Sequence, residues 1–79
     1  MKERDARLLM DVGALHGATV TPAPMEPARW AILLHRADGQ EVQLERQRGG
    51  LRTFATLDAA AAALGALGFR SFEVRRAEL

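Results

Sequence analysis

The segment from Arg29 to Gln47 constrains the fold more than any other part of the chain, because its pattern is that of a β-hairpin. It reads RWAILLHRADGQEVQLERQ, in which two runs of strand-forming residues flank an Asp-Gly dipeptide. Asp-Gly between such runs is a strong short-range indication of a hairpin turn. The chain is therefore expected to contain a sheet with this hairpin at its centre.

The register of the hairpin follows from the distribution of its apolar residues. A two-residue loop would pair Leu34 with Gln43 and scatter the apolar side chains over both faces. A three-residue loop, Ala37-Asp38-Gly39, pairs Leu34 with Val42, Ile32 with Leu44 and Trp30 with Arg46. That register sets His35 opposite Glu41 on one face and gathers the apolar set on the other: Trp30, Ile32, Leu34, Val42 and Leu44. The sequence therefore predicts the three-residue loop with Gly39 at its bulge.

The N-terminal part predicts a helix over residues 5–16. Leu8, Val12 and Leu15 recur at helical spacing with Leu9 and His16 beside them, and this face is expected to pack on the core. Gly17 is expected to end the helix. Residues 18–21 (ATVT) then predict a short strand. The connector that follows, residues 22–27, holds three prolines in six residues and is expected to be neither helix nor central strand.

The C-terminal third predicts a short strand or extended lead-in, then an alanine-rich helix, then a strand. Thr56 is a suitable N-cap and Gly68 a suitable C-cap. The expected buried face of this helix comprises Leu57, Ala60, Ala61, Leu64 and Leu67. In the final strand, residues 70–74, alternation predicts that Phe72 and Val74 point inward.

These elements predict an α+β fold: a small single sheet with the hairpin at its centre, packed by the N-terminal helix and by the alanine-rich helix that leads into the final strand. We expect one domain over residues 1–79, organised as an N-terminal helix (1–17), the proline-rich connector (22–27) and a hairpin–helix–strand unit (28–76). A chain of 79 residues without cysteine has a small core and no disulfide to support it. We therefore expect a homodimer or a protein partner.

Composition excludes several classes of protein. The net charge is +1, so any binding to nucleic acid requires a local basic patch. No apolar run reaches the 18 residues of a membrane span, and the charged start does not have the pattern of a signal peptide. A cytoplasmic location and no membrane partner are expected.

Catalytic, metal and cofactor sites are not expected either. With two histidines and no cysteine, a structural zinc site has too few ligands. His35 is best explained by a cross-strand pair with Glu41, and His16 by a position at a helix end. No nucleophile has a recognisable partner in the sequence, and no cofactor-binding motif is present. The protein is expected not to be an enzyme.

The candidate binding residues are five arginines, which we call the arginine patch: Arg46, Arg48, Arg52, Arg70 and Arg75. The first three flank Gly49-Gly50 in RQRGGLR, and the other two join them only if the strands are neighbours. The patch could contact phosphates or an acidic protein surface. The alternatives are a solvated loop and an edge strand protected by its charges. Leu33, on the other face of the hairpin, marks a dimer or partner surface unless a helix covers it. Trp30 is a packing anchor or part of that surface.

Residues 52–74 (RTFATLDAAAAALGALGFRSFEV) resemble a pattern found in the ParC family of partition-associated proteins of plasmids and other mobile elements. The shared features are Phe54 before Thr-Leu-Asp-Ala-Ala, then Leu67-Gly68 and a final strand. The resemblance implies a non-enzymatic accessory role in partition or maintenance, exerted through binding. Two alternatives remain open: a small phage- or plasmid-encoded inhibitor of a host complex such as a defence nuclease, and a protein that binds DNA directly through the arginine patch.

Overall fold

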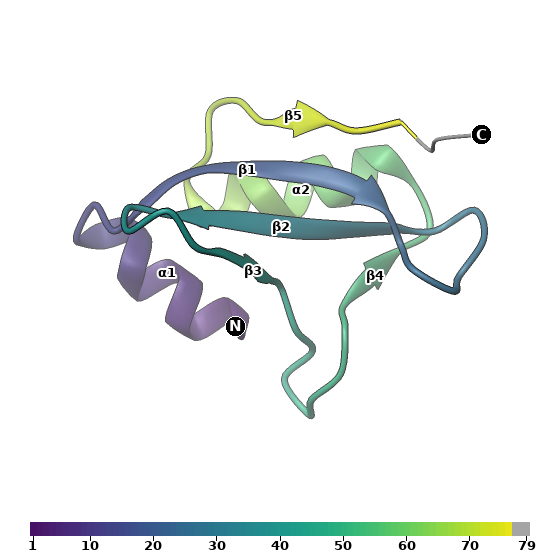
Figure 1. Cartoon of the computed structure of the whole chain (residues 1–79), viewed down its shortest axis with the longest axis horizontal. Coiled ribbons are helices and arrows are strands. Elements are labelled where there is room, and N and C mark those ends of the chain that lie inside the picture. Colours follow the sequence, from purple (N-terminus) through teal and green to yellow (C-terminus); the bar gives the residue numbers. More distant parts are fainter. Residues whose placement is uncertain (77–79) are drawn as a thin grey trace.

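The computed structural model describes residues 1–76 and has the predicted α+β class: two helices packed on one mixed sheet (Figure 1). The strand order is β3-β2-β1-β5, and β4 pairs with β2 beyond the end of β3. All pairs are antiparallel except β1 with β5. The elements, in chain order, are α1 (Glu3–Asp11), β1 (Leu15–Pro22), β2 (Trp30–Arg36), β3 (Glu41–Gln43), β4 (Thr53–Phe54), α2 (Leu57–Leu67) and β5 (Glu73–Val74).

The β2–β3 hairpin has the predicted register. Leu34 pairs with Val42 and His35 with Glu41. Arg36 and Gln40 close the loop through a backbone hydrogen bond of 2.8 Å, and Gly39 has a φ of +91°. The predicted apolar face is the core face: Ile32, Leu34 and Leu44 are fully buried, and Trp30 and Val42 pack against them.

One predicted pair is wrong. Trp30 lies opposite Phe54 of β4, not opposite Arg46. The chain leaves the sheet after Leu44, whose amide still donates to the oxygen of Ile32. β4 takes its place, so that the largely buried Phe54, and not an arginine, extends the core beside Trp30. A cross-strand aromatic pair is favourable there, whereas a charge would have to be desolvated.

Helix α2 begins and ends as its sequence predicts. The Thr56 hydroxyl accepts a hydrogen bond from the amide of Ala59 (3.0 Å), and Gly68 closes the helix in the left-handed region with a φ of +103°. The buried residues of α2 are Ala60, Leu64 and Leu67, while Leu57 and Ala61 are partly buried. This helix lies on the core face of the sheet, behind β1 and β2 in Figure 1.

Helix α1 differs from its prediction in length and in orientation. It ends after Asp11, because Gly13 takes a φ of +74°, a conformation that glycine adopts without steric cost. Leu15, His16 and Gly17 belong to β1, which is longer than predicted. Ala6 is fully buried, with Leu9 and Met10 packed against the core, whereas Leu8 and Val12 are 60% and 75% exposed. The predicted inward face of α1 therefore points outward.

The last strand is shorter than predicted, and only Phe72 packs against the core; Val74 is 43% exposed. The other face of the sheet, opposite the helices, carries Thr19, Leu33 and His35 and has no helix on it among residues 1–76 (Figure 1). Leu33 is half-buried on this helix-free face, whereas Trp30 packs at the rim of the core. Neither helix is long enough or apolar enough to cross a bilayer.

Candidate binding loop

The connection between β3 and β4, residues 45–52, is an ordered turn that we call the arginine loop. Gly49 and Gly50 have φ values of +92° and +84°, which side-chain-bearing residues rarely adopt. The amide of Arg46 donates to the oxygen of Gly50 (2.8 Å), and the amide of Gly49 donates to the oxygen of Arg46 (2.9 Å). Leu51 returns opposite Glu45 in an antiparallel bridge. The two glycines thus hold the loop as a tight hairpin that projects from the sheet (Figure 1).

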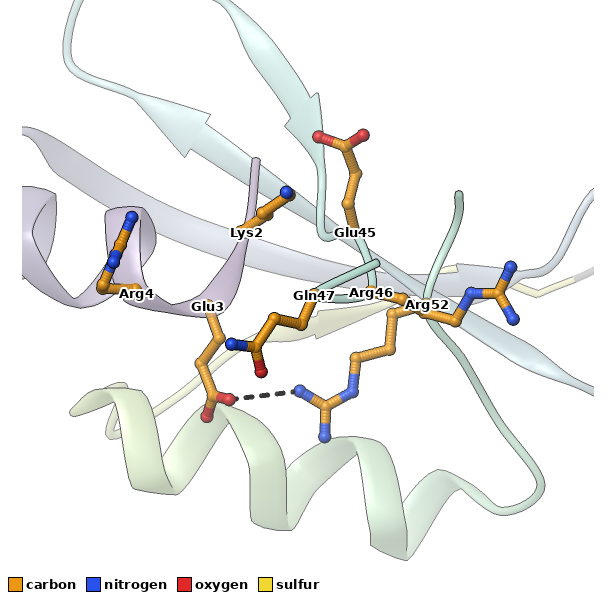
Figure 2. Close-up of a pocket in the computed structure, with 7 residues that line it drawn as sticks. All are labelled: Lys2, Glu3, Arg4, Glu45, Arg46, Gln47 and Arg52. Atoms are coloured by element: carbon orange, nitrogen blue, oxygen red, sulfur yellow. Dashed lines mark hydrogen bonds and ion pairs between the residues drawn. The ribbon is translucent and has the colours of Figure 1, made fainter. Parts of the chain in front are cut away.

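The start of the chain packs against the base of this loop. Lys2 forms a parallel bridge with Glu45, whose amide donates to the oxygen of Met1 (2.7 Å). The loop and the first turn of α1 together enclose a hollow of about 540 Å³ (Figure 2), lined by Lys2, Glu3, Arg4, Glu45, Arg46, Gln47 and Arg52. A second hollow, of about 590 Å³, shares Arg46 and Arg52 and adds Arg29. Sequence reasoning missed Lys2, Arg4 and Arg29, because only the tertiary fold brings them to the loop.

Arg52 is held by the fold. Its guanidinium Nη1 lies 3.5 Å from the Glu3 carboxylate, the contact drawn in Figure 2, and it stacks 5.0 Å from the centre of the Phe54 ring. The same Glu3 also pairs with Arg7 at 3.7 Å. Arg52, the last residue of the loop, therefore links α1 to β4 and is only partly exposed.

Arg46 and Arg48 carry the exposed charge of the loop. Arg46 Nε donates to the oxygen of Gly49 (3.2 Å), which holds the side chain over its own turn and, in Figure 2, directs it away from Glu3. Within residues 1–76, neither arginine forms an ion pair, and Arg48 forms no side-chain hydrogen bond. These two cations are therefore available to a partner.

Arg70 and Arg75 do not join the loop. Arg75 follows β5 and donates from its amide to the oxygen of Val20, on the edge of β1 away from β2. β3 and β4 pair with the other side of β2, so the strands that would unite the arginine patch are not neighbours. The five arginines therefore do not form one patch, and their role in binding stays a prediction.

The Glu45 carboxylate has a partner at the start of the chain. The Met1 α-ammonium group donates to it and to the backbone oxygen of Gln43 (2.9 Å). The hydrogen bond and the charge of this ammonium group hold the pKa of Glu45 below its ordinary value. The carboxylate therefore anchors the first residues of the chain to the loop.

The lowered pKa predicts a contribution of Glu45 to acid stability. Glu45 binds its proton less readily in the folded chain than in the unfolded chain, so its contribution is complete above the ordinary carboxyl pKa. It is lost as the pH falls through the lowered value. We expect Glu45→Gln to flatten the decline in unfolding free energy between about pH 5 and about pH 3, measured by urea denaturation. Acetylation of the α-amino group should have the same effect, because it removes the positive charge that lowers the pKa of Glu45. A profile of Glu45→Gln identical to that of the unmodified chain would contradict the assignment.

The polar side chains on the helix-free face form a linear network. His35 Nδ1 lies 3.1 Å from the Glu41 carboxylate, which confirms the predicted pair, and His35 Nε2 lies 2.7 Å from the Thr19 hydroxyl. The order hydroxyl, imidazole, carboxylate is also that of a nucleophile and its base. Thr19 is only 1% exposed, however, so its hydroxyl has no access to a substrate. The network is best explained as satisfaction of a buried hydroxyl.

The expected position of His16 at a helix end is wrong, because His16 lies exposed in β1. Within residues 1–76, no three His, Cys, Asp or Glu side chains are grouped so that they could hold a metal ion.

The comparison with known proteins supports the family resemblance. No curated protein and no solved structure gives a significant match. The model of the ParC-like family matches residues 2–78, which is nearly the whole chain and extends far beyond the third that carried the resemblance in the sequence. The chain belongs to the ParC-like family.

Proposed function

We propose that the chain is a non-enzymatic accessory protein of a plasmid or another mobile element, associated with its partition or maintenance, and that it acts by binding a protein partner. The observation that carries the proposal is the arginine loop: Arg46 and Arg48 are exposed on an ordered turn and have no ion-pair partner in the described part of the chain. Membership of the ParC-like family supports the accessory role.

The shape of the loop favours an acidic protein surface as its partner. A guanidinium group binds a carboxylate through two parallel hydrogen bonds, and such pairs are among the stronger polar contacts. Acidic side chains are already present at both hollows, Glu3 and Glu45 in the first and Glu26 in the second. They lower the local positive potential that a nucleic-acid backbone would require. A partner with a few defined carboxylates fits this mixed surface better than a continuous polyphosphate does.

The first experiment is a pull-down from a bacterial host that carries the chain with a C-terminal tag, with and without nuclease treatment. A protein partner that survives nuclease supports the proposal, and its identity separates a partition complex from a host defence complex. Partners that all disappear with nuclease would contradict it and favour direct DNA binding. In that case, affinity should fall steeply with salt, because each neutralised phosphate releases counterions.

The charge of the loop can be tested on the partner that this experiment identifies. Reversing it with Arg46→Glu and Arg48→Glu should leave the fold intact, since both side chains are exposed. We expect the dissociation constant to rise at least about tenfold, because the new carboxylates repel the acidic partner. Titration calorimetry or surface plasmon resonance would measure the change, with circular dichroism to verify folding.

The matched control reverses Arg70 and Arg75, which lie away from the loop. The proposal expects Arg70→Glu with Arg75→Glu to keep most of the affinity. Equal losses in the two double variants would show that only the overall charge matters, and full affinity in the loop variant would exclude the loop as the binding site.

A further inference from the structure

Helix α1 exposes an apolar stripe to solvent. Leu8 and Val12, one helical turn apart, are 60% and 75% exposed, while Ala6, Leu9 and Met10 on the opposite side of α1 pack into the core. Val12 is the C-cap just beyond the end of α1, and its exposed side chain lies four residues after that of Leu8, about one helical turn along. Met25, the other strongly exposed apolar residue, stands alone in the proline-rich connector. Nothing in residues 1–76 covers the stripe on α1.

The charges beside the stripe have a particular arrangement. At 100° per residue, Arg4 and Asp11 are rotated around the helix axis by about 40° and about 60° from Leu8, both in the same direction, so they lie on the same flank. Arg4 lies about 6 Å from Leu8 toward the start of the helix, and Asp11 about 4.5 Å toward its end. Both side chains are exposed, and neither forms an ion pair within residues 1–76.

A two-fold axis through Leu8 would bring together Leu8, Arg4 and Asp11 of two copies. Val12 lies about 40° to the other side of Leu8 and takes no part in these contacts. Two copies of α1 related by such an axis run antiparallel. A residue on one flank of the first copy then faces the same flank of the second copy, at the residue that lies equally far from Leu8 in the opposite direction along the helix. Leu8 then meets Leu8 of the second copy, and Arg4 meets Asp11 of the second copy on each side of the axis. The flank is therefore complementary to itself in the antiparallel arrangement.

We propose that α1 is a self-association surface, and that its partner is a second copy of this chain packed antiparallel through Leu8 with two reciprocal contacts between Arg4 and Asp11. A nine-residue helix covers less than the roughly 800 Å² per partner of a standard interface. The association is therefore weak and depends on concentration. The self-association surface is then on α1. Leu33, on the helix-free face, lies outside this surface.

Sedimentation velocity of the untagged chain over a wide concentration range tests the proposal, and no other partner is needed. We expect a reversible monomer–dimer equilibrium. Leu8→Glu should raise the dissociation constant at least about tenfold, and Met25→Glu, the same change at an isolated exposed residue, should not change it. A chain that stays monomeric at every concentration, or equal effects of the two variants, would overturn the proposal.

Charge exchange tests the arrangement of the two copies. Arg4→Asp and Asp11→Arg should each weaken the dimer, because each replaces two attractive contacts by two repulsive ones. The chain with both changes should regain the dimer, and both changes also suit the helix dipole, so folding is not at risk. A double variant as weak as the single ones would exclude this pairing.

The absence of cysteine permits a direct check of the axis. At an interaxial distance of 8–10 Å and a Cα radius of about 2.3 Å, residues on the axis have Cα atoms about 3.4 to 5.4 Å apart, and the upper part of this range suits a disulfide. Leu8→Cys should therefore form a disulfide-linked dimer under mild oxidation much faster than Met25→Cys. Equal rates would contradict the axis.

Discussion

Replacing Leu64 with alanine is expected to lower the free energy of unfolding by about 3 kcal/mol, within the range of about 2–5 kcal/mol for a buried leucine. Leu64 of α2 is fully buried and belongs to the core cluster that joins both helices to the sheet. A domain of this size has a total stability on the order of 5 to 10 kcal/mol, so the variant should lose a large part of it. Urea denaturation followed by the fluorescence of Trp30, which packs against the same core, measures the loss.

Leu8→Ala is the matched control for this prediction. It makes the same chemical change on α1 at a residue that is 60% exposed, and we expect a change within about 0.5 kcal/mol at protein concentrations where the chain is monomeric. The pair also tests the orientation of α1. A loss at Leu8 as large as the loss at Leu64 would mean that Leu8 faces the core, as the helical spacing alone predicts.

Enlarging Ala60 to leucine is expected to destabilise the chain by about 1–3 kcal/mol, although leucine and alanine are both good helix formers. Ala60 is fully buried where α2 approaches the sheet, and three additional carbon atoms have no space there unless the helix moves. The same denaturation experiment measures the loss.

Ala62→Leu gives the comparison on the same helix. Ala62 is exposed, so the added side chain enters solvent and should change the free energy of unfolding by no more than about 0.5 kcal/mol. If Ala60→Leu were as stable as Ala62→Leu, α2 would not be seated closely on the sheet.

The elements that the sequence predicts well are those whose determinants are local. The ends of α2 depend on Thr56 and Gly68, each acting within one helical turn. The hairpin register depends on a three-residue loop and on the alternation of its two strands. Each of these choices can be judged within a short segment, because a slip of one residue would expose the apolar set.

Helix α1 shows where local reasoning stops. Its sequence offers two apolar faces, one with Leu8 and Val12 and the other with Ala6, Leu9 and Met10. Helical spacing favours the first, but the early end at Gly13 moves Leu15 into β1 and removes the third member of that face. The second face then packs on α2 and the sheet. Only the tertiary structure decides between them.

The candidate site was predictable only in part. RQRGGLR identified the loop and its exposed arginines, but the partner of Arg52 is Glu3, which lies 49 positions away in the chain. The separation of Arg70 and Arg75 from the loop follows from the order of the strands, which no local pattern specifies. The sequence could thus name basic residues without showing which of them lie together.

The parallel pair of β1 and β5 has a consequence for the synthesis of the chain. Thr19 and Val20 of β1 pair with Glu73 and Val74 of β5, which are synthesised more than fifty residues later. Until then, the long strand β1 has an edge of unpaired backbone groups, which can pair with a strand of another molecule. Nascent chains, premature-stop products and fragments cut before β5 all share this open edge. A chain that lacks β5 is therefore expected to expose this edge of β1 to pairing with another molecule, which favours aggregation.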